Sequence, residues 1–133
     1  MIKKLFILLI VAAIVAVASY PIWSKRMAEK SFENPAKADP KKIKKAIMVQ
    51  KDFQNYKGAG AMSEKSVIYF PESRQIPFFV YNAALCAEKE NKPFVAIYWY
   101  QMFIKNYPKH EWYNQAGHQL EVLKGLNGID TKK

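Results

Sequence analysis

The first part of the chain contains an unbroken apolar run. Leu5 to Ala18 carries no charged side chain, and Lys3 and Lys4 precede it as a basic flank. Continued to Trp23, the mostly apolar stretch is nineteen residues long, close to the roughly 20 residues that a membrane-spanning helix needs. The pattern predicts a transmembrane signal anchor over residues 1–23.

Two interpretations fit this run. As an anchor, it places Tyr20 and Trp23 in an interfacial aromatic belt and Lys25 and Arg26 at the far membrane surface. As a signal peptide, it offers the small-residue motif Ala16–Ala18 as a cleavage site. We favour the anchor, because an aromatic pair followed by a basic pair suits a membrane interface better than a mature N-terminus.

The short N-terminal flank sets the expected orientation. Such a flank usually stays on the cytoplasmic side, which would put residues 24–133 outside the cytoplasm. We therefore expect a single-pass protein of a bacterial inner membrane with a periplasmic C-terminal domain. Cleavage after Ala18 would instead release that domain into the periplasm.

The rest of the chain has a helical pattern and no clear strand. Residues 24–40 have few apolar positions and are predicted to be a basic linker. Apolar residues then recur every three to four positions, and prolines and glycines separate the segments. Helices are expected over residues 40–57, from 61 or 62 to 70, from between 73 and 77 to 90, over 93–107 and over 112–126. Asp39 is expected to cap the first of these helices, and Gly58 to Gly60 to end it. We predict an all-α domain over 41–128 and a polar tail over 129–133.

An internal repeat runs through this domain. A shift of 37 residues aligns Ala59 with Ala96, Val67 with Ile104, Phe70 with Tyr107 and Pro71 with Pro108. In the clearer copy, Val80 to Pro108, small alanines stand where two antiparallel helices would meet, and the second helix ends in the phrase Phe103-Ile104-Lys105-Asn106-Tyr107-Pro108. In the first copy Ser63 and Ser66 stand where the second has Tyr100 and Phe103.

These features resemble the tetratricopeptide repeat family, whose helix-turn-helix unit is about 34 residues long. The resemblance covers roughly residues 41–128, or about two and a half units, and is closest to repeats of bacterial envelope proteins. It implies antiparallel helix pairs and a scaffold or accessory subunit that binds other proteins, with no catalysis and no cofactor. In that family the concave surface is lined by first helices, which makes Tyr81 and Asn82 candidates for partner contacts.

Aromatic side chains are the other candidates for an interface. So few repeats bury little surface, because stacking normally involves three or more repeats and polar caps. Some aromatic residues are therefore expected to stay exposed unless a partner covers them, and aromatic residues are enriched at interfaces. The candidates are Tyr98, Trp99, Trp112 and Tyr113. Filling of the domain's own core is the alternative for each.

Net charge narrows the class of partner. The chain has 21 Lys and Arg against 11 Asp and Glu, a net charge of +10. Residues 1–30 and 31–60 each carry +4, and residues 61–133 only +2, whereas a nucleic-acid-binding domain would carry its basic excess on the folded part. We expect no nucleic acid partner. The cluster Lys37, Lys41, Lys42, Lys44 and Lys45 fits an anionic lipid surface or, alternatively, a solvated helix face.

Chemistry-bearing residues are sparse. Cys86 is expected to be buried and inert, His110 to lie in a loop and His118 on a helix surface, and Glu88 and Glu90 to be solvated. One cysteine and two histidines make a zinc site improbable, and we expect no metal and no enzyme activity. Two alternatives stand beside the scaffold hypothesis. One is a small structural subunit of a respiratory or photosynthetic membrane complex, and the other is a secreted ligand-binding or enzymatic domain using His118 or Cys86.

Overall fold

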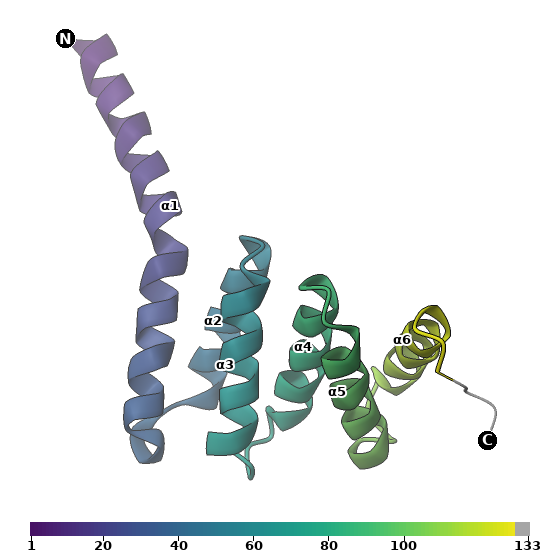
Figure 1. Cartoon of the computed structure of the whole chain (residues 1–133). Helices are drawn as coiled ribbons and strands as arrows, with labels where there is room; N and C mark the ends of the chain where they lie inside the picture. Colours follow the sequence, from purple (N-terminus) through teal and green to yellow (C-terminus); the bar gives the residue numbers. More distant parts are fainter. Residues whose placement is uncertain (130–133) are drawn as a thin grey trace.

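The computed structural model describes residues 1–129 and confirms the all-α prediction (Figure 1). A long N-terminal helix is followed by five shorter ones, packed in sequence and antiparallel to their neighbours. The elements are α1 (Ile2–Glu33), the short 3₁₀ turn η1 (Pro35–Lys37), α2 (Pro40–Asp52), α3 (Tyr56–Tyr69), α4 (Ile76–Lys89), α5 (Pro93–Asn106) and α6 (Tyr113–Leu126). Residues 130–133 of the expected polar tail lie outside the described residues.

Helix α1 has two halves with different surroundings. Every side chain from Met1 to Ala18 is exposed, and this half rises beyond the other helices in Figure 1. From Ser19 onward the helix packs against α2 and α3, and Ala28 and Phe32 are buried in the core. Among the described residues, α1 is the one helix long and apolar enough to cross a membrane, a property that an N-terminal signal sequence shares.

The segment predicted to be a linker, residues 24–40, is mostly helical. Helix α1 continues to Glu33 and only η1 and short turns separate it from α2. No proline or glycine interrupts Ser24–Glu33, and Ala28 and Phe32 lie four residues apart, on one face of the helix. Two buried apolar residues on one face are enough to hold this largely polar segment against the domain. The linker prediction was wrong because it relied on the low apolar content of the segment.

The boundary between the next two helices also differs from the prediction. Helix α2 ends at Asp52, and α3 begins at Tyr56, so that Gly58 and Gly60 lie inside α3 and do not end α2. The side chain of Asn55 caps α3, because its Oδ1 accepts from the backbone NH of Gly58 at 3.1 Å. A Cβ on Gly60 would lie 3.0 Å from Cβ of Cys86 on α4. The glycines therefore serve close packing.

The other predicted boundaries hold. Helices α4, α5 and α6 begin and end within a few residues of the positions expected from the sequence. The expected cap of α2 is present as well, since Oδ1 of Asp39 accepts from the backbone NH of Lys41 at 3.0 Å. Pro40 occupies the first helical position, where its missing NH costs no hydrogen bond.

The backbone repeats with a period of 37 residues. Helices α3 and α5 begin and end 37 residues apart, and so do α4 and α6. The three-residue connections 53–55 and 90–92 each hold their middle residue in the left-handed region, Gln54 at φ 59° and Asn91 at φ 57°. The structure therefore contains, in its backbone, the repeat that the sequence shift predicted.

Helix α1 occupies the first position of this array. Residues 34–39 connect α1 to α2, and connections of the same length, 70–75 and 107–112, join α3 to α4 and α5 to α6. Displacing α3 by 37 residues toward the N-terminus gives residues 19–32, which are the part of α1 that packs against the domain. The apolar helix thus runs without a break into the helical array.

Large and small side chains exchange places between the two repeats. Phe103 on α5 and Ser66, its counterpart on α3, are both fully buried. The small Ser66 hydroxyl is satisfied within its own helix, because it donates to the carbonyl of Met62 at 2.6 Å. On the other helix of the pair the order is reversed, because Phe79 on α4 is fully buried where α6 has the small Ala116. The two repeats thus place their large buried side chains on different helices.

Helix α6 presents a polar face where α4 presents an apolar one. Four residues of α4 pack in the core shared with α5 and α6, namely Val80, Tyr81, Ala84 and Ala87. Their counterparts 37 residues later are Gly117, His118, Glu121 and Lys124. A polar outer face is characteristic of the helix that caps a repeat array, because no further helix packs there.

Two glycine substitutions should change stability in opposite directions. Gly60→Val should lower the free energy of unfolding by about 1–3 kcal/mol, because the added side chain forces α3 away from Cys86 on α4. Gly125→Ala is the matched control, because nothing lies within 4 Å of a Cβ at that helical position. It should raise the free energy of unfolding by about 0.5–1 kcal/mol. Thermal or urea unfolding of both variants measures this, and a loss of stability in both would contradict the packing argument.

Candidate functional site

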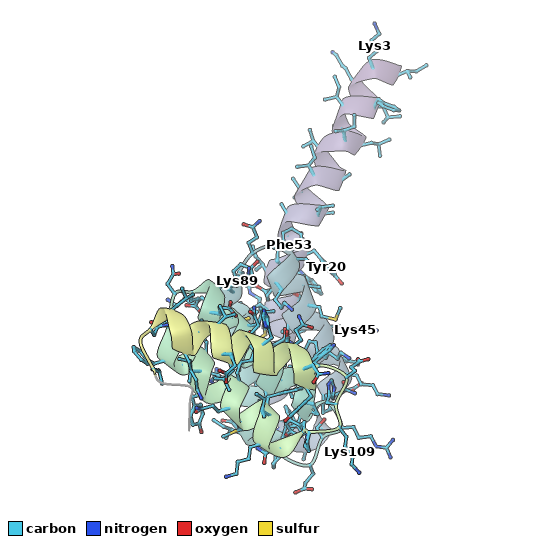
Figure 2. The ribbon with its side chains drawn as sticks, turned by 90° about the vertical axis from the view of Figure 1, so that its right-hand side faces the viewer. Lys3, Tyr20, Lys45, Phe53, Lys89 and Lys109 are labelled. Atoms are coloured by element: carbon cyan, nitrogen blue, oxygen red, sulfur yellow. The ribbon has the colours of Figure 1, made fainter. Side chains whose placement is uncertain are left out.

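The predicted membrane-interface residues lie where the exposed half of α1 meets the domain. Tyr20 is 58% and Trp23 68% exposed, so the chain itself covers neither ring. Lys25 and Arg26 follow on the same helix, and Lys25 Nζ lies 3.9 Å from a carboxylate oxygen of Glu29. Figure 2 shows Tyr20 at the top of the domain, with the apolar half of α1 and Lys3 extending away from it.

A buried glutamine fastens α2 to α1 at this level. Gln50 is 1% exposed, and its Nε2 donates to the carbonyl oxygen of Pro21 at 2.5 Å and to Oγ of Ser24 at 3.1 Å. Its Oε1 accepts from Nδ2 of Asn55 at 2.6 Å. Since Asn55 also caps α3, one chain of hydrogen bonds joins α1, α2 and the start of α3. Such a satisfied buried network fixes the direction of α1 relative to the domain.

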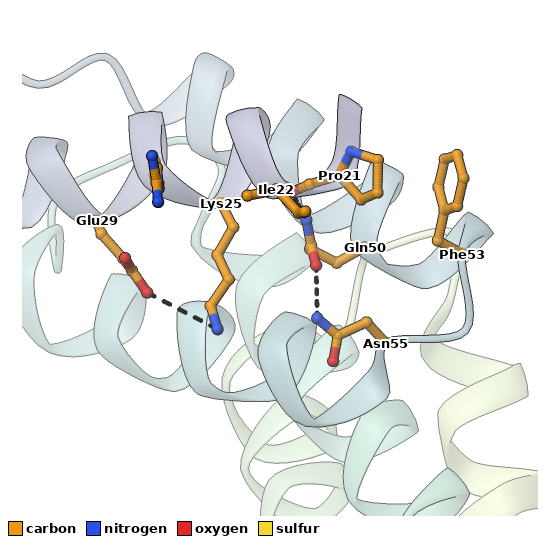
Figure 3. Close-up of a pocket in the computed structure, with 8 residues that line it drawn as sticks. Pro21, Ile22, Lys25, Glu29, Gln50, Phe53 and Asn55 are labelled. Carbon is orange, nitrogen blue, oxygen red and sulfur yellow. Dashed lines mark hydrogen bonds and ion pairs between the residues drawn. The ribbon is translucent and has the colours of Figure 1, made fainter. Parts of the chain in front are cut away.

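Two hollows flank the seam between α1 and α2, and they differ in chemistry. The first, of about 530 Å³, has mixed walls, with the charged Lys25, Arg26 and Glu29 of α1 beside the apolar Ile22 and Phe53. Figure 3 shows this hollow, with the Lys25–Glu29 ion pair and the Gln50–Asn55 hydrogen bond drawn across it. The carboxylate of Glu29 neutralises part of the positive charge that Lys25 and Arg26 bring to this hollow.

The second hollow is an apolar groove of about 560 Å³ on the other side of the seam. We call it the α1–α2 groove. Its α1 wall includes Ala16, Tyr20, Trp23 and Met27, and its α2 wall Ile43, Ala46 and Val49. Within residues 1–129, Lys42 and Lys45 are the charged residues of its lining, and no carboxylate is among them. The groove therefore combines apolar walls with a purely basic rim.

The two residues predicted to line a peptide groove, Tyr81 and Asn82, are buried in the domain. Tyr81 is 7% exposed and its ring centroid lies 4.8 Å from that of Trp112. Burial raises the pKa of the Tyr81 hydroxyl, and the charge of Glu88 adds to the shift. Asn82 is 1% exposed. Its Oδ1 accepts from Nζ of Lys51 at 2.7 Å, which links α4 to α2.

The carboxylate of Glu88, which the sequence suggested was solvated, is a structural acceptor. It accepts from the hydroxyl of Tyr100 at 2.9 Å and from Nε2 of Gln119 at 3.4 Å. These bonds join α4 to α5 and α6. Burial, and then the hydrogen bond to Glu88, raise the pKa of the Tyr100 hydroxyl. The sequence signal was available, because a fully buried tyrosine needs a polar partner for its hydroxyl.

The aromatic candidates divide by exposure. Tyr98 is 53% exposed, and Phe94, one helical turn before it, is 65% exposed. Helix α5 therefore keeps apolar surface that the chain does not cover. Trp99 is half-buried, and its Nε1 donates to Oε1 of Glu64 on α3 at 3.2 Å. Trp112 and Tyr113 are half-buried at the start of α6. The expectation of at least one exposed aromatic group is met by Phe94 and Tyr98.

Cys86 is buried on α4, as expected. Burial raises the pKa of its thiol to about 11, and Glu90 and Glu64 add to the shift while Lys51 opposes it. A thiol with this pKa holds almost no thiolate near neutral pH, and the thiolate is the reactive form.

We expect the native chain to resist alkylation by iodoacetamide at pH 8, and the urea-unfolded chain to react readily at its single cysteine. The raised pKa of Cys86 also makes the free energy of unfolding fall as pH rises. The native state holds the Cys86 proton more tightly than the unfolded state, so this stabilising contribution is complete below pH ~9 and is lost as pH rises toward about 11. Mass spectrometry of the alkylated chain measures the first effect, and urea unfolding from pH 8 to 11 the second. Rapid native labelling at pH 8 would show that the thiol is accessible.

The histidines lie where the sequence placed them. His110 lies in the connection between α5 and α6, where its Nδ1 accepts from the backbone NH of Trp112 at 3.0 Å. His118 is exposed on α6. Within residues 1–129, no three His, Cys, Asp or Glu side chains gather in a way that could hold a metal ion.

Sequence reasoning missed the residues that form the seam. It found Tyr20 and Trp23, and it placed Ala46 and Gln50 on the mostly apolar face of the helix expected over 40–57, but it gave no part in a site to Gln50, Asn55, Ala46 or Val49. Only the polar position of Gln50 among the apolar residues of α2 signalled a buried network. Neither a protein-family model, nor a curated protein, nor a solved structure matches the chain.

Proposed function

We propose that this chain is a single-pass membrane protein whose helical domain binds other proteins as a tetratricopeptide-like scaffold or accessory subunit. The observation that carries the proposal is the division of α1. Its first half is apolar and exposed, while its second half is the first packing helix of the repeat array. An exposed apolar helix of this length has no favourable surroundings in water, but it has in a bilayer.

The proposed orientation puts the domain outside the cytoplasm of a bacterial cell, at the periplasmic face of the inner membrane. Its support is the short N-terminal flank with Lys3 and Lys4. Because α1 continues from the apolar half into the packed half, the domain would sit at a fixed angle to the bilayer and close to its surface.

The tetratricopeptide-like part of the proposal is supported by the backbone repeat. The 37-residue displacement of the helices, the alternation of short and longer connections and the polar face of α6 are what a short capped array of this kind would have. The length of the unit exceeds the usual repeat by about three residues. Such arrays carry out recognition and not chemistry, so we propose no catalytic step and no cofactor.

The partner surface is proposed to include the exposed apolar residues of α5 and α6. Phe94, Tyr98, Val122 and Leu126 are between 41% and 78% exposed. Because α5 and α6 are antiparallel neighbours, the N-terminal end of α5 lies beside the C-terminal end of α6, where these residues occur. Exposed apolar side chains on neighbouring helix ends are candidates for an interaction surface, and Phe94 and Tyr98, four residues apart on α5, share one face of that helix.

The test is affinity purification of the full chain from membranes in mild detergent, with the co-purifying chains identified and quantified by mass spectrometry. The proposal predicts one or more proteins at constant stoichiometry, and their loss in the double variant Phe94→Ala/Tyr98→Ala. The control variant, Ile68→Ala/Tyr69→Ala, changes exposed residues of α3 and should keep the partners. Equal partner recovery from all three proteins would overturn the proposed surface. Removal of residues 2–18, the exposed half of α1, should leave partner binding intact, whereas in a subunit that associates through its span this deletion would abolish it.

A further inference from the structure

We propose that the α1–α2 groove binds one anionic phospholipid from the leaflet next to the domain. The inference deepens the proposed function and rests on its membrane anchor. It concerns a single lipid seated in a defined site, and so goes beyond a general attraction between the basic stem and the membrane surface.

The walls of the groove supply the site for an acyl chain. Ala16 belongs to the apolar run of α1 and Tyr20 to its interfacial end, so this end of the groove opens at the boundary of the hydrocarbon. On the facing wall, Val49 is next to Gln50, which is hydrogen-bonded to the carbonyl of Pro21. Val49 therefore lies at the level of Tyr20. An acyl chain laid here would cover apolar side chains that the protein leaves partly open.

The basic rim is placed where the phosphate of that lipid would lie. Helix α2 runs antiparallel to α1, so positions before Val49 lie farther from the membrane. Lys45 is one helical turn from Val49, about 6 Å along the axis, and Lys42 is about 10 Å away. The headgroup layer of a bilayer is about 5–8 Å thick on each side, so Lys45 falls within this layer and Lys42 just beyond its outer edge, within reach of its long side chain. Figure 2 shows Lys45 on the same side of the domain as Tyr20 and farther from the N-terminus.

Charge determines which class of lipid fits. Lys42 and Lys45 are both exposed, and the part of the chain that the structure describes contributes no carboxylate to the groove. The neighbouring hollow on the other side of the seam contains Glu29 beside Lys25 and so lacks this uncompensated charge. Two free ammonium groups above an apolar groove complement a headgroup with net negative charge, such as phosphatidylglycerol, better than the zwitterionic phosphatidylcholine.

The test uses the full chain in mild detergent and native mass spectrometry with added dioleoyl-phosphatidylglycerol or dioleoyl-phosphatidylcholine. We expect one phosphatidylglycerol to bind in preference to phosphatidylcholine. The variant Lys42→Gln/Lys45→Gln should weaken phosphatidylglycerol binding about 10- to 30-fold, and leave phosphatidylcholine binding unchanged. The control Lys105→Gln/Lys109→Gln removes the same charge from exposed positions near the connection between α5 and α6, and should not change binding.

A second variant tests the apolar part of the site. Val49→Trp should fill the groove from the α2 wall and prevent binding of the lipid while both lysines remain. Val122→Trp is its control, since Val122 is exposed on α6. Circular dichroism of each variant shows whether the helical content is retained.

Several results would overturn the inference. These are equal binding of both lipids, an equal loss in both lysine double variants, undiminished binding by Val49→Trp, or a co-purifying transmembrane segment in place of the lipid. The same spectra separate this failure from failure of the proposed function. A full-length chain at 15.4 kDa without bound lipid would leave the anchor intact and remove the lipid site. A chain that lacks residues 1–18 would remove both, since Ala16 is part of the site.

Discussion

Replacing Phe103 by alanine should lower the free energy of unfolding by about 3–5 kcal/mol. Phe103 is fully buried, and its ring lies against three others, with centroids 5.6 Å from Tyr81, 5.4 Å from Tyr107 and 5.3 Å from His110. Tyr81 lies on α4, and Tyr107 and His110 lie in the connection to α6, so that with Phe103 itself on α5 the cavity would open at the junction of three segments. Urea unfolding followed by circular dichroism measures the change.

The matched control lies on the same helix. Phe94→Ala removes the same atoms from a side chain that is 65% exposed, and should change the free energy of unfolding by no more than about 0.5 kcal/mol. If the two substitutions cost the same, the core would not be organised around Phe103, and the packing described between α4, α5 and α6 would be wrong.

Placing two arginines in the apolar half of α1 should remove the protein from the membrane. Ile10 and Ile14 are exposed, lie four residues apart on one face of α1 and fall near the centre of the apolar run. On the insertion scale, an arginine at the centre of a span costs about 2.5–3.5 kcal/mol, so that Ile10→Arg/Ile14→Arg costs about 5–7 kcal/mol. Fractionation of cells with carbonate extraction measures the distribution of the chain.

The control keeps the charge and changes its place. Ile68→Arg/Tyr69→Arg adds two arginines to exposed positions of α3, outside the proposed span, and should leave the chain in the carbonate-resistant membrane fraction. Membrane retention of the Ile10→Arg/Ile14→Arg variant would show that the apolar half of α1 is not what holds the protein there.

The helices α4 to α6 were predictable because local signals agreed with tertiary packing. Pro93 begins α5, and the apolar residues of α4 and α5 follow helical spacing. The errors occurred where a tertiary contact outweighed a local rule. Glycine is typical of a helix end, but at position 60 the missing side chain lets α3 approach Cys86 on α4. In the same way, the burial of Ala28 and Phe32 stabilises the helical conformation of the polar segment 24–33, although its composition alone favours a linker.

The candidate site was less predictable than the fold. Aromatic type and position identified Tyr20, Trp23 and Tyr98, all of which the chain leaves exposed. The same criteria chose Tyr81, whose burial depends on how α6 brings Trp112 against α4. The α1–α2 groove could not be inferred, because it depends on the relative direction of two helices that is set by tertiary contacts, the hydrogen bonds of Gln50 and the packing of Ala28 and Phe32 among them.

The continuity of α1 gives the proposed anchor a second role. Residues 19–32 stand where a 37-residue repeat would place the helix before α2, so the proposed membrane helix and the first packing helix are one element. A partner docked on the domain would therefore be held at a set height and angle above the bilayer. A flexible tether would give the partner reach but no such orientation.

The most direct test of this account is the intact mass of the chain recovered from cells, measured separately in the membrane and soluble fractions. An uncleaved anchor that continues into the repeat array predicts the full 15.4 kDa in the carbonate-resistant membrane fraction. A soluble chain beginning at Ser19 would contradict the account, because the apolar half of α1 would then be a removed signal sequence and the domain a free protein.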